Sequence, residues 1–179
     1  IKSCACIGGI LGATESVAGT SVQTARVTVE ESDNAAKVVY NSTGYYSSAF
    51  DNPLNIGGVV GYLEGVLSGC NNTGEVYVRG YEHDAENNIK TKVRPLSAGG
   101  VAGFSAKIES CRNTGKIDVD VAVGGLDTDE NIQYTGPAKE ASVGGVVGKS
   151  SASTSSCHNE GNMIVDLHME SSNGTPGAL

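Results

Sequence analysis

A glycine-rich block that recurs four times constrains this chain more than any other feature of its sequence. The block reads IGGILG at residues 7–12, IGGVVG at 56–61, AGGVAG at 98–103 and VGGVVG at 143–148. The first glycine of each pair stands at Gly8, Gly57, Gly99 and Gly144, so successive copies are 49, 42 and 45 residues apart. Self-similarity at such a period is typical of proteins that stack one structural unit on the next.

A second block follows each glycine block. It reads CNNTGEVYV at residues 70–78, CRNTGKIDV at 111–119 and CHNEGNMIV at 157–165. In the first copy we align it with SVQTARVTV at residues 21–29, which lies at the same distance from its glycine pair and has Ser21 in place of the cysteine. These repeats predict a single β-repeat domain over residues 1–179, with copies near 7–55, 56–97, 98–142 and 143–179. Because Ile1 lies almost inside the first block, we interpret the chain as a segment of a larger protein.

The repeat unit has the pattern of short β-strands joined by turns. Val76 and Val78 alternate with polar residues, as do Ile117 and Val119, which is the period of a half-buried strand. Asn-Thr-Gly supplies turn residues before these strands, and no stretch shows sustained helical periodicity. We therefore predict an all-β, repeat-built β-solenoid that resembles a parallel β-helix. Each repeat of 42–49 residues fits either one coil with insertions or two ordinary coils.

The composition excludes several classes of function. With 20 acidic and 12 basic residues, the formal net charge of −8 would repel a phosphate backbone, so we expect no nucleic-acid partner. The longest apolar runs are only a few residues, too short for a membrane span. The sequence motifs of serine hydrolases, zinc peptidases and P-loop proteins are absent, and we predict that the chain is not an enzyme.

Asp118 and Asp120 are the carboxylate pair that most resembles the catalytic pair of a polysaccharide hydrolase. They alternate outward on one predicted strand, and Asp166 lies on the matching strand of the last copy. No cluster of Arg or Lys accompanies them, as a lyase would need. We interpret them as solvent-facing residues of a strand.

Three cysteines, Cys70, Cys111 and Cys157, occupy one position of the repeat. Stacked copies would bring them into an internal column of small apolar side chains, with a disulfide or a metal site as the alternative. Cys4 and Cys6 lie on one face of a strand, and we expect them to be buried and inert or to face a partner. The glycine pairs are expected to belong to the same structural frame, at Gly57, Gly58, Gly99, Gly100, Gly144 and Gly145.

Acidic residues recur after the predicted alternating strand in the first three copies. Stacking would bring them to one edge of the solenoid, where carboxylate oxygens at this density suit Ca²⁺. The residues are Glu31, Asp33, Asp84, Glu86, Asp127, Asp129 and Glu130. The alternative is a solvated acidic edge that keeps the solenoid soluble and unpaired. No cofactor other than calcium is indicated.

Aromatic residues gather in the first long variable segment, at Tyr40, Tyr45, Tyr46 and Phe50. Tyrosine among serine and asparagine is a composition suited to the recognition of a glycan or a protein. Tyr81 begins the corresponding segment of the second copy. The alternative is that these rings cover the apolar face beneath them.

The segment GGVVGYLEGVLSGCNNTGEVYV at residues 57–78 resembles the GLUG-type repeat of bacterial secreted and surface proteins. The resemblance covers nearly the whole chain, with three good copies and a degenerate first one. It implies a β-rich solenoid outside the cell, in the company of adhesin-like and fimbria-associated proteins, and it assigns no catalytic residue to the repeat. A fold of this kind does not by itself determine function.

Three functions follow as hypotheses for a secreted or cell-surface location. The first is a non-enzymatic adhesive or stalk segment that presents loops to a glycan or to a surface protein of a host or neighbouring cell. The second is a structural subunit of a filament or larger surface assembly, with self-association through the solenoid ends. The third is an accessory module of an extracellular enzyme that degrades polysaccharide or protein.

Overall fold

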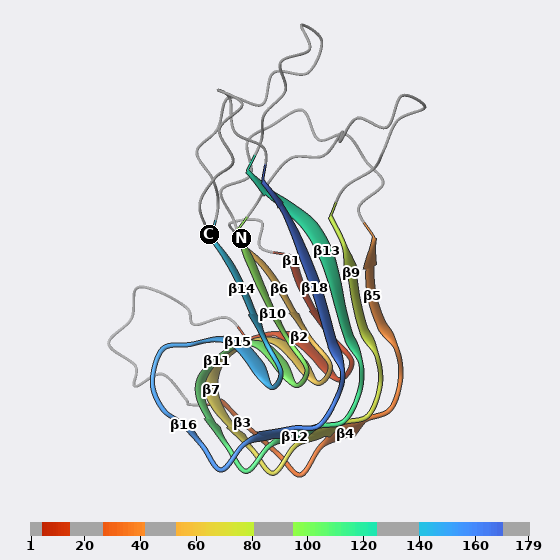
Figure 1. Cartoon of the computed structure of the whole chain (residues 1–179). Helices are drawn as coiled ribbons and strands as arrows, with labels where there is room; N and C mark the ends of the chain where they lie inside the picture. Colours follow the sequence, from red (N-terminus) through yellow and green to blue (C-terminus); the bar gives the residue numbers. More distant parts are fainter. Residues whose placement is uncertain (1–4, 15–26, 42–52, 81–94, 125–139, 170–179) are drawn as a thin grey trace, which may run out of the picture.

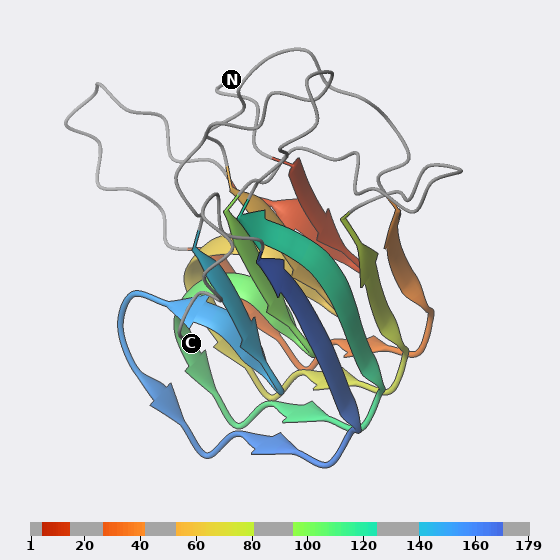
Figure 2. The same cartoon turned by 45° about the horizontal axis from the view of Figure 1, so that its top comes forward.

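The chain folds into a parallel β-solenoid of four stacked coils, which confirms the predicted fold class (Figures 1 and 2). The computed structural model describes residues 5–14, 27–41, 53–80, 95–124 and 140–169. Every strand pair among them is parallel, and each pair joins one coil to the next. Each repeat forms one coil, which decides between the two coil counts that the repeat length allowed.

Four parallel sheets, here called A to D in chain order, make up the wall of the solenoid. Sheet A contains β1 (Ala5–Gly8), β6 (Leu54–Gly57), β10 (Leu96–Gly99) and β14 (Ala141–Gly144). Sheet B contains β2 (Leu11–Ala13), β3 (Val27–Glu30), β7 (Val60–Ser68), β11 (Ala102–Glu109), β15 (Val147–Ser150) and β16 (Thr154–Ser155). Sheet C contains β4 (Asp33–Asn34), β8 (Asn71–Asn72), β12 (Arg112–Asn113) and β17 (His158–Asn159). Sheet D contains β5 (Val38–Asn41), β9 (Val76–Arg79), β13 (Ile117–Gly124) and β18 (Met163–Met169).

We number the coils 1 to 4 in chain order, so that coil 1 runs from β1 to β5 and coil 4 from β14 to β18. Within a coil the chain descends along sheet A, reverses at the glycine pair, curves through sheet B, crosses sheet C and rises along sheet D (Figure 1). The glycine pairs lie in register, because Gly8, Gly57, Gly99 and Gly144 are consecutive partners in sheet A.

The register corrects the predicted alignment of the first copy. Asp33 and Asn34 pair with Asn71 and Asn72, so the residue that takes the cysteine position in coil 1 is Ser32 and not Ser21. The alignment was wrong because coil 1 carries residues 15–26 between β2 and β3, whereas the prediction placed every length difference after the last strand of a coil.

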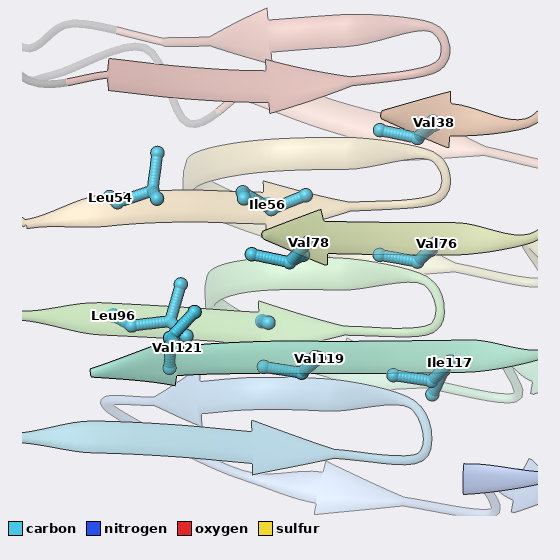
Figure 3. Close-up of a cluster of buried hydrophobic side chains, with 10 residues drawn as sticks. Val38, Leu54, Ile56, Val76, Val78, Leu96, Ile117, Val119 and Val121 are labelled. Carbon is cyan, nitrogen blue, oxygen red and sulfur yellow. The ribbon is translucent and has the colours of Figure 1, made fainter. Parts of the chain in front are cut away.

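Two apolar clusters fill the solenoid. One lies between sheets A and D, where Ile56, Val78 and Val119 are fully buried, and Figure 3 shows its side chains stacked from coil to coil. The other is enclosed by the curve of sheet B and includes Leu67 and Ile108. The alternation seen in the sequence therefore places one face of each sheet D strand inside, and the burial of these side chains is the main favourable contribution to folding.

The third glycine of each block allows the start of sheet B in one coil to approach sheet A of the preceding coil at backbone distance. A Cβ on Gly103 would collide with the backbone of Ile56 in sheet A, and one on Gly148 would lie 2.6 Å from the Ala98 amide nitrogen. Sheet A and the start of sheet B therefore touch through their main chains, which explains why the block is glycine-rich.

Candidate functional site

Most of the predicted binding residues belong to the segments of the chain that connect sheet D to sheet A. Residues 42–52, 81–94 and 125–139 join the end of sheet D in one coil to the start of sheet A in the next. These strand ends lie together at the top of Figure 1. The predicted binding residues that belong to these three segments lie outside the described residues: Tyr45, Tyr46, Phe50, Tyr81, Asp84, Glu86, Asp127, Asp129 and Glu130.

Tyr40 is the member of the aromatic group that the structure describes. It lies on β5, is half-buried and packs against the apolar cluster between sheets A and D. For this residue the structure favours packing over recognition.

Glu31 and Asp33 do not share the edge that the sequence predicted for the acidic residues. Glu31 lies in the corner between β3 and β4 and Asp33 begins β4, whereas the other acidic residues follow β9 and β13. Asp33 Oδ1 accepts a hydrogen bond of 2.8 Å from Asn71 Nδ2 of coil 2. Glu31 has a φ of 45° and pairs in the stack with Gly69, Ser110 and Ser156, which also have positive φ. The expectation of a common place in the repeat was wrong, because the misplaced first copy shifted these two residues.

The cysteines of the repeat form a column at the corner that follows sheet B. Cys70 and Cys111 are buried, and Cys157 in coil 4 is half-buried. Each thiol contacts a carbonyl oxygen two residues earlier, at 3.3 Å for Cys70 and Cys111 and 3.2 Å for Cys157. All three are free cysteines.

The column keeps its central thiol protonated. The hydrogen bond from Cys111 to the Cys70 sulfur, together with burial, raises the pKa of Cys111 well above its ordinary value. The protonated Cys111 thiol is a poor nucleophile and a poor metal ligand, since both roles require the thiolate. The same hydrogen bond lowers the pKa of Cys70 to about 7. Among the described residues no group of three or more His, Cys, Asp or Glu side chains is placed to hold a metal ion.

Asp118 lies in a network of ion pairs on the outer face of sheet D. Its carboxylate is 2.6 Å from Lys116 Nζ and 2.9 Å from Arg79 Nη1. Arg79 Nε also lies 3.6 Å from Asp120. The network continues through Glu75, whose carboxylate lies 3.7 Å from Lys116 and 2.7 Å from Lys37.

This network corrects two expectations about the Asp118 and Asp120 pair. Asp118 is buried, and two basic residues do accompany it. The hydrogen bonds from Lys116 and Arg79 hold the pKa of Asp118 below its ordinary value, although burial opposes this shift. A general acid for glycoside hydrolysis needs the opposite shift, so Asp118 serves as an ion-pair partner and not as a proton donor.

Tyr77 lies at the centre of the same face. Its ring is contacted by Lys37 Nζ at 4.3 Å and by the Arg79 guanidinium carbon at 4.2 Å from the centroid. Both cations come within the range of cation–π attraction. The ring is therefore occupied by the protein's own cations.

An asparagine ladder runs through the interior and was not among the features predicted from the sequence. Asn34 Nδ2 donates to Asn72 Oδ1, Asn72 Nδ2 to Asn113 Oδ1 and Asn113 Nδ2 to Asn159 Oδ1, each at 2.8 Å. Every Nδ2 also donates to the carbonyl oxygen two residues later in its own coil. The signal was present, because asparagine stands two residues after the cysteine in all three good copies.

The ladder explains the second glycine of each pair. A Cβ on Gly58 would collide with the carboxamide of Asn72, and a Cβ on Gly100 would collide with that of Asn113. Each asparagine therefore lies directly over a glycine of its own coil, and the two motifs of the repeat form one structural unit.

A second aromatic feature, also not predicted, lies on the outer face of sheet B. The rings of Tyr62 and Phe104 stack with centroids 4.7 Å apart and an interplanar angle of 15°. The two residues are partners in the register of β7 and β11, so the stack follows from the repeat itself. Tyr62 also donates a hydrogen bond of 2.6 Å to Glu64.

These features define a repeat protein of the parallel β-solenoid class, built on glycine–asparagine contacts. The chain carries a GLUG motif, since the family model of that motif matches residues 52–77, which run from just before β6 into β9. No curated protein and no solved structure matches the chain. Within the described part of the chain, no helix is long and apolar enough to cross a membrane.

Proposed function

We propose that this chain is a non-enzymatic adhesive segment of a secreted or cell-surface bacterial protein. One observation carries the proposal: three connections of unrelated sequence join the same two sheets of a regular frame. Variable segments held at one edge of a rigid scaffold are the arrangement in which proteins place binding residues.

The frame supports this function because its own polar groups are used in holding the coils together. The interior asparagines bond to one another, and the carboxylates of the sheet D network face cations. The GLUG motif supports the extracellular location, because repeats of this type occur in bacterial secreted and surface proteins. The partner would be a glycan or a surface protein of another cell.

The test is binding of the purified chain to arrays of glycans and extracellular matrix proteins, with calcium and with a chelator. Three variants replace residues 42–52, 81–94 or 125–139 with Gly-Ser segments of equal length. We expect a specific hit that at least one replacement abolishes. Loss of binding in chelator would in addition support calcium at the acidic segments.

A matched control changes the surface far from this edge. Arg112 and Glu160 form an exposed, bidentate ion pair on sheet C, with N–O distances of 2.6 and 3.1 Å. The double variant Arg112→Ala and Glu160→Ala should bind as the original chain does. The proposal fails if no array component binds, or if all three replacements leave binding unchanged.

A further inference from the structure

Among the described residues, the large apolar side chains that are exposed belong to the two end coils. The large exposed hydrophobic residues of the described part of the chain are Ile10, Val27 and Val39 in coil 1 and Met163, Ile164 and Val165 in coil 4. Coils 2 and 3 contribute none to this set. Apolar side chains that gather on one face of a protein, and are not scattered singly, are a feature of surfaces that bind a partner.

Met163 occupies an inward-facing position of the repeat that is buried in the other coils. Met163 continues a column of Val38, Val76 and Ile117, and its partner Ile117 is fully buried while Met163 is 37% exposed. Among the described residues β13 is the one strand that pairs with β18, so the other side of β18 has no neighbouring coil in that part of the chain. A coil 1 placed there would set Val38 against Met163, which continues the column with apolar residues throughout.

An outward column points more specifically to a second copy of this chain. On the outer face of sheet D the partners in order are Val39, Tyr77, Asp118 and Ile164. The two central positions carry an aromatic and a charged residue, whereas the two ends are apolar, with Val39 50% and Ile164 46% exposed. Stacking of coil 1 on coil 4 would place these two apolar side chains next to each other.

The asparagine ladder gives this contact a direction. Each asparagine donates from its Nδ2 to the Oδ1 of the following coil. Asn159 ends the ladder with one Nδ2 hydrogen on Gly161 O and no acceptor for the other among the described residues. Asn34 begins the ladder with its Oδ1 facing no earlier asparagine in that part of the chain. The donor end is thus on coil 4 and the acceptor end on coil 1.

The hydrogen-bonding groups at the sheet C corner are complementary in the same register. The column runs from Asp33 through Asn71 and Arg112 to His158. A carboxylate, which accepts hydrogen bonds, therefore stands at the coil 1 end, and an imidazole, which carries an N–H donor, stands at the coil 4 end. Head-to-tail stacking would bring them together, whereas a contact between two copies of coil 4 would pair the histidines.

We propose that two copies of this chain associate head to tail, with coil 4 of one covering coil 1 of the next. The contact continues all four parallel sheets, the asparagine ladder and the apolar columns that already join neighbouring coils within the chain. Because the two faces differ, the interface is heterologous and leaves one face of each kind open, so the assembly extends as a filament. This inference does not depend on the proposed adhesive function.

The test uses two variants of the full chain that each block one face. Val165→Lys puts a charge into the coil 4 face, and Ile10→Lys puts one into the coil 1 face; both sites are exposed in the single chain, so folding should be retained. A buried uncompensated charge should weaken association about 100-fold. The matched control is Thr114→Lys, which adds the same charge at an exposed position of coil 3.

Sedimentation equilibrium over a range of protein concentrations reads out the result. The original chain and Thr114→Lys should form species larger than the 18.2 kDa monomer as concentration rises, and each blocked variant alone should stay monomeric. An equimolar mixture of the two blocked variants should stop at a dimer, because one open face of each kind remains. A monomeric original chain at all concentrations would overturn the proposal. So would association that Val165→Lys abolishes and Ile10→Lys leaves intact, since that pattern indicates contact between two coil 4 faces.

Discussion

Coils 2 and 3 differ from coils 1 and 4 in environment more than in sequence. The same repeat positions are fully buried at Ile117 in coil 3 and more than a third exposed at Met163 in coil 4. In the middle coils every asparagine of the ladder has a partner on both sides, whereas Asn34 and Asn159 have one each. The stability of the fold therefore comes from contacts between neighbouring coils, as in other repeat proteins. A coil with a neighbour on both sides is more stable than a coil at an end of the stack.

The largest difference between the middle and the ends should appear in the asparagine ladder. Asn72→Ala removes the acceptor of Asn34 and the donor of Asn113, so buried polar groups lose their partners on both sides. We expect it to lower the free energy of unfolding by about 4 kcal/mol, and Asn159→Ala to lower it by only about 1 kcal/mol. Urea denaturation of the monomeric chain measures both, and equal losses would contradict the comparison.

The next largest effect concerns the apolar column. Ile117→Ala should cost about 3 kcal/mol, because it removes buried methyl and methylene groups and leaves a cavity between sheets A and D. Met163→Ala at the same repeat position should cost about 1 kcal/mol or less, since solvent already reaches that side chain. The same denaturation experiment ranks the two variants. A larger loss for Met163→Ala than for Ile117→Ala would contradict the claim that the middle coils gain more stability from apolar burial than the end coils.

The ion pairs provide a test that depends on pH. The folded-state pKa of Asp118 lies below its ordinary value, so its carboxylate stabilises the fold above a pH of about 3.9. That contribution is lost as the pH falls through the lowered pKa. Asp118→Asn should therefore cost about 1 kcal/mol at pH 7, and the difference from the original chain should shrink toward a pH of about 2.

The control for this prediction lies on coil 4. Glu160 pairs with Arg112 on an exposed surface, where ion pairs contribute little, so Glu160→Gln should leave the unfolding curve at neutral pH unchanged. A gap between Asp118→Asn and the original chain that persists unchanged in strong acid would mean that the carboxylate charge is not its cause.

The smallest predicted effect is a gain in stability that should be equal in a middle coil and in an end coil. Ser110 in coil 3 and Ser156 in coil 4 have φ angles of 54° and 51°, a conformation that glycine adopts without strain. Ser110→Gly and Ser156→Gly should each raise the free energy of unfolding by about 0.5 kcal/mol, because this strain is local. Thermal denaturation measures both shifts. A gain confined to coil 3 would show that the corner conformation depends on the neighbouring coil.

The frame of this fold was predictable because the repeat marks it directly. The glycine block and the C-x-N-x-G block recur at nearly constant spacing in three copies, and parallel stacking needs only that spacing to place strands in register. The alignment of the first copy was wrong because residues 15–26 lie between two strands of coil 1, and the constant spacing of the other copies does not predict an insertion there. Its retained asparagine, Asn34, would have located it.

The side-chain networks were less accessible from the sequence. The Asp118 site combines Lys116 of the same strand region with Arg79 of the neighbouring coil, and this pairing follows only from the register of β9 and β13. Burial of Asp118 on the outer face likewise could not be predicted from the alternating pattern of its strand. The asparagine ladder, in contrast, could have been found, since an internal polar residue at a fixed repeat position needs a partner in the next copy.

Amide hydrogen exchange of the monomeric chain tests the central claim most directly. The amides of Val59 and Val101 donate to carbonyl oxygens of the next coil at 2.9 and 2.8 Å, while the equivalent amide of Val146 has no carbonyl partner among the described residues. We predict that Val59 and Val101 exchange only through global unfolding and that Val146 exchanges much faster. Equal protection of the three amides, or faster exchange in the middle coils, would contradict the view that each coil is stabilised by its neighbours.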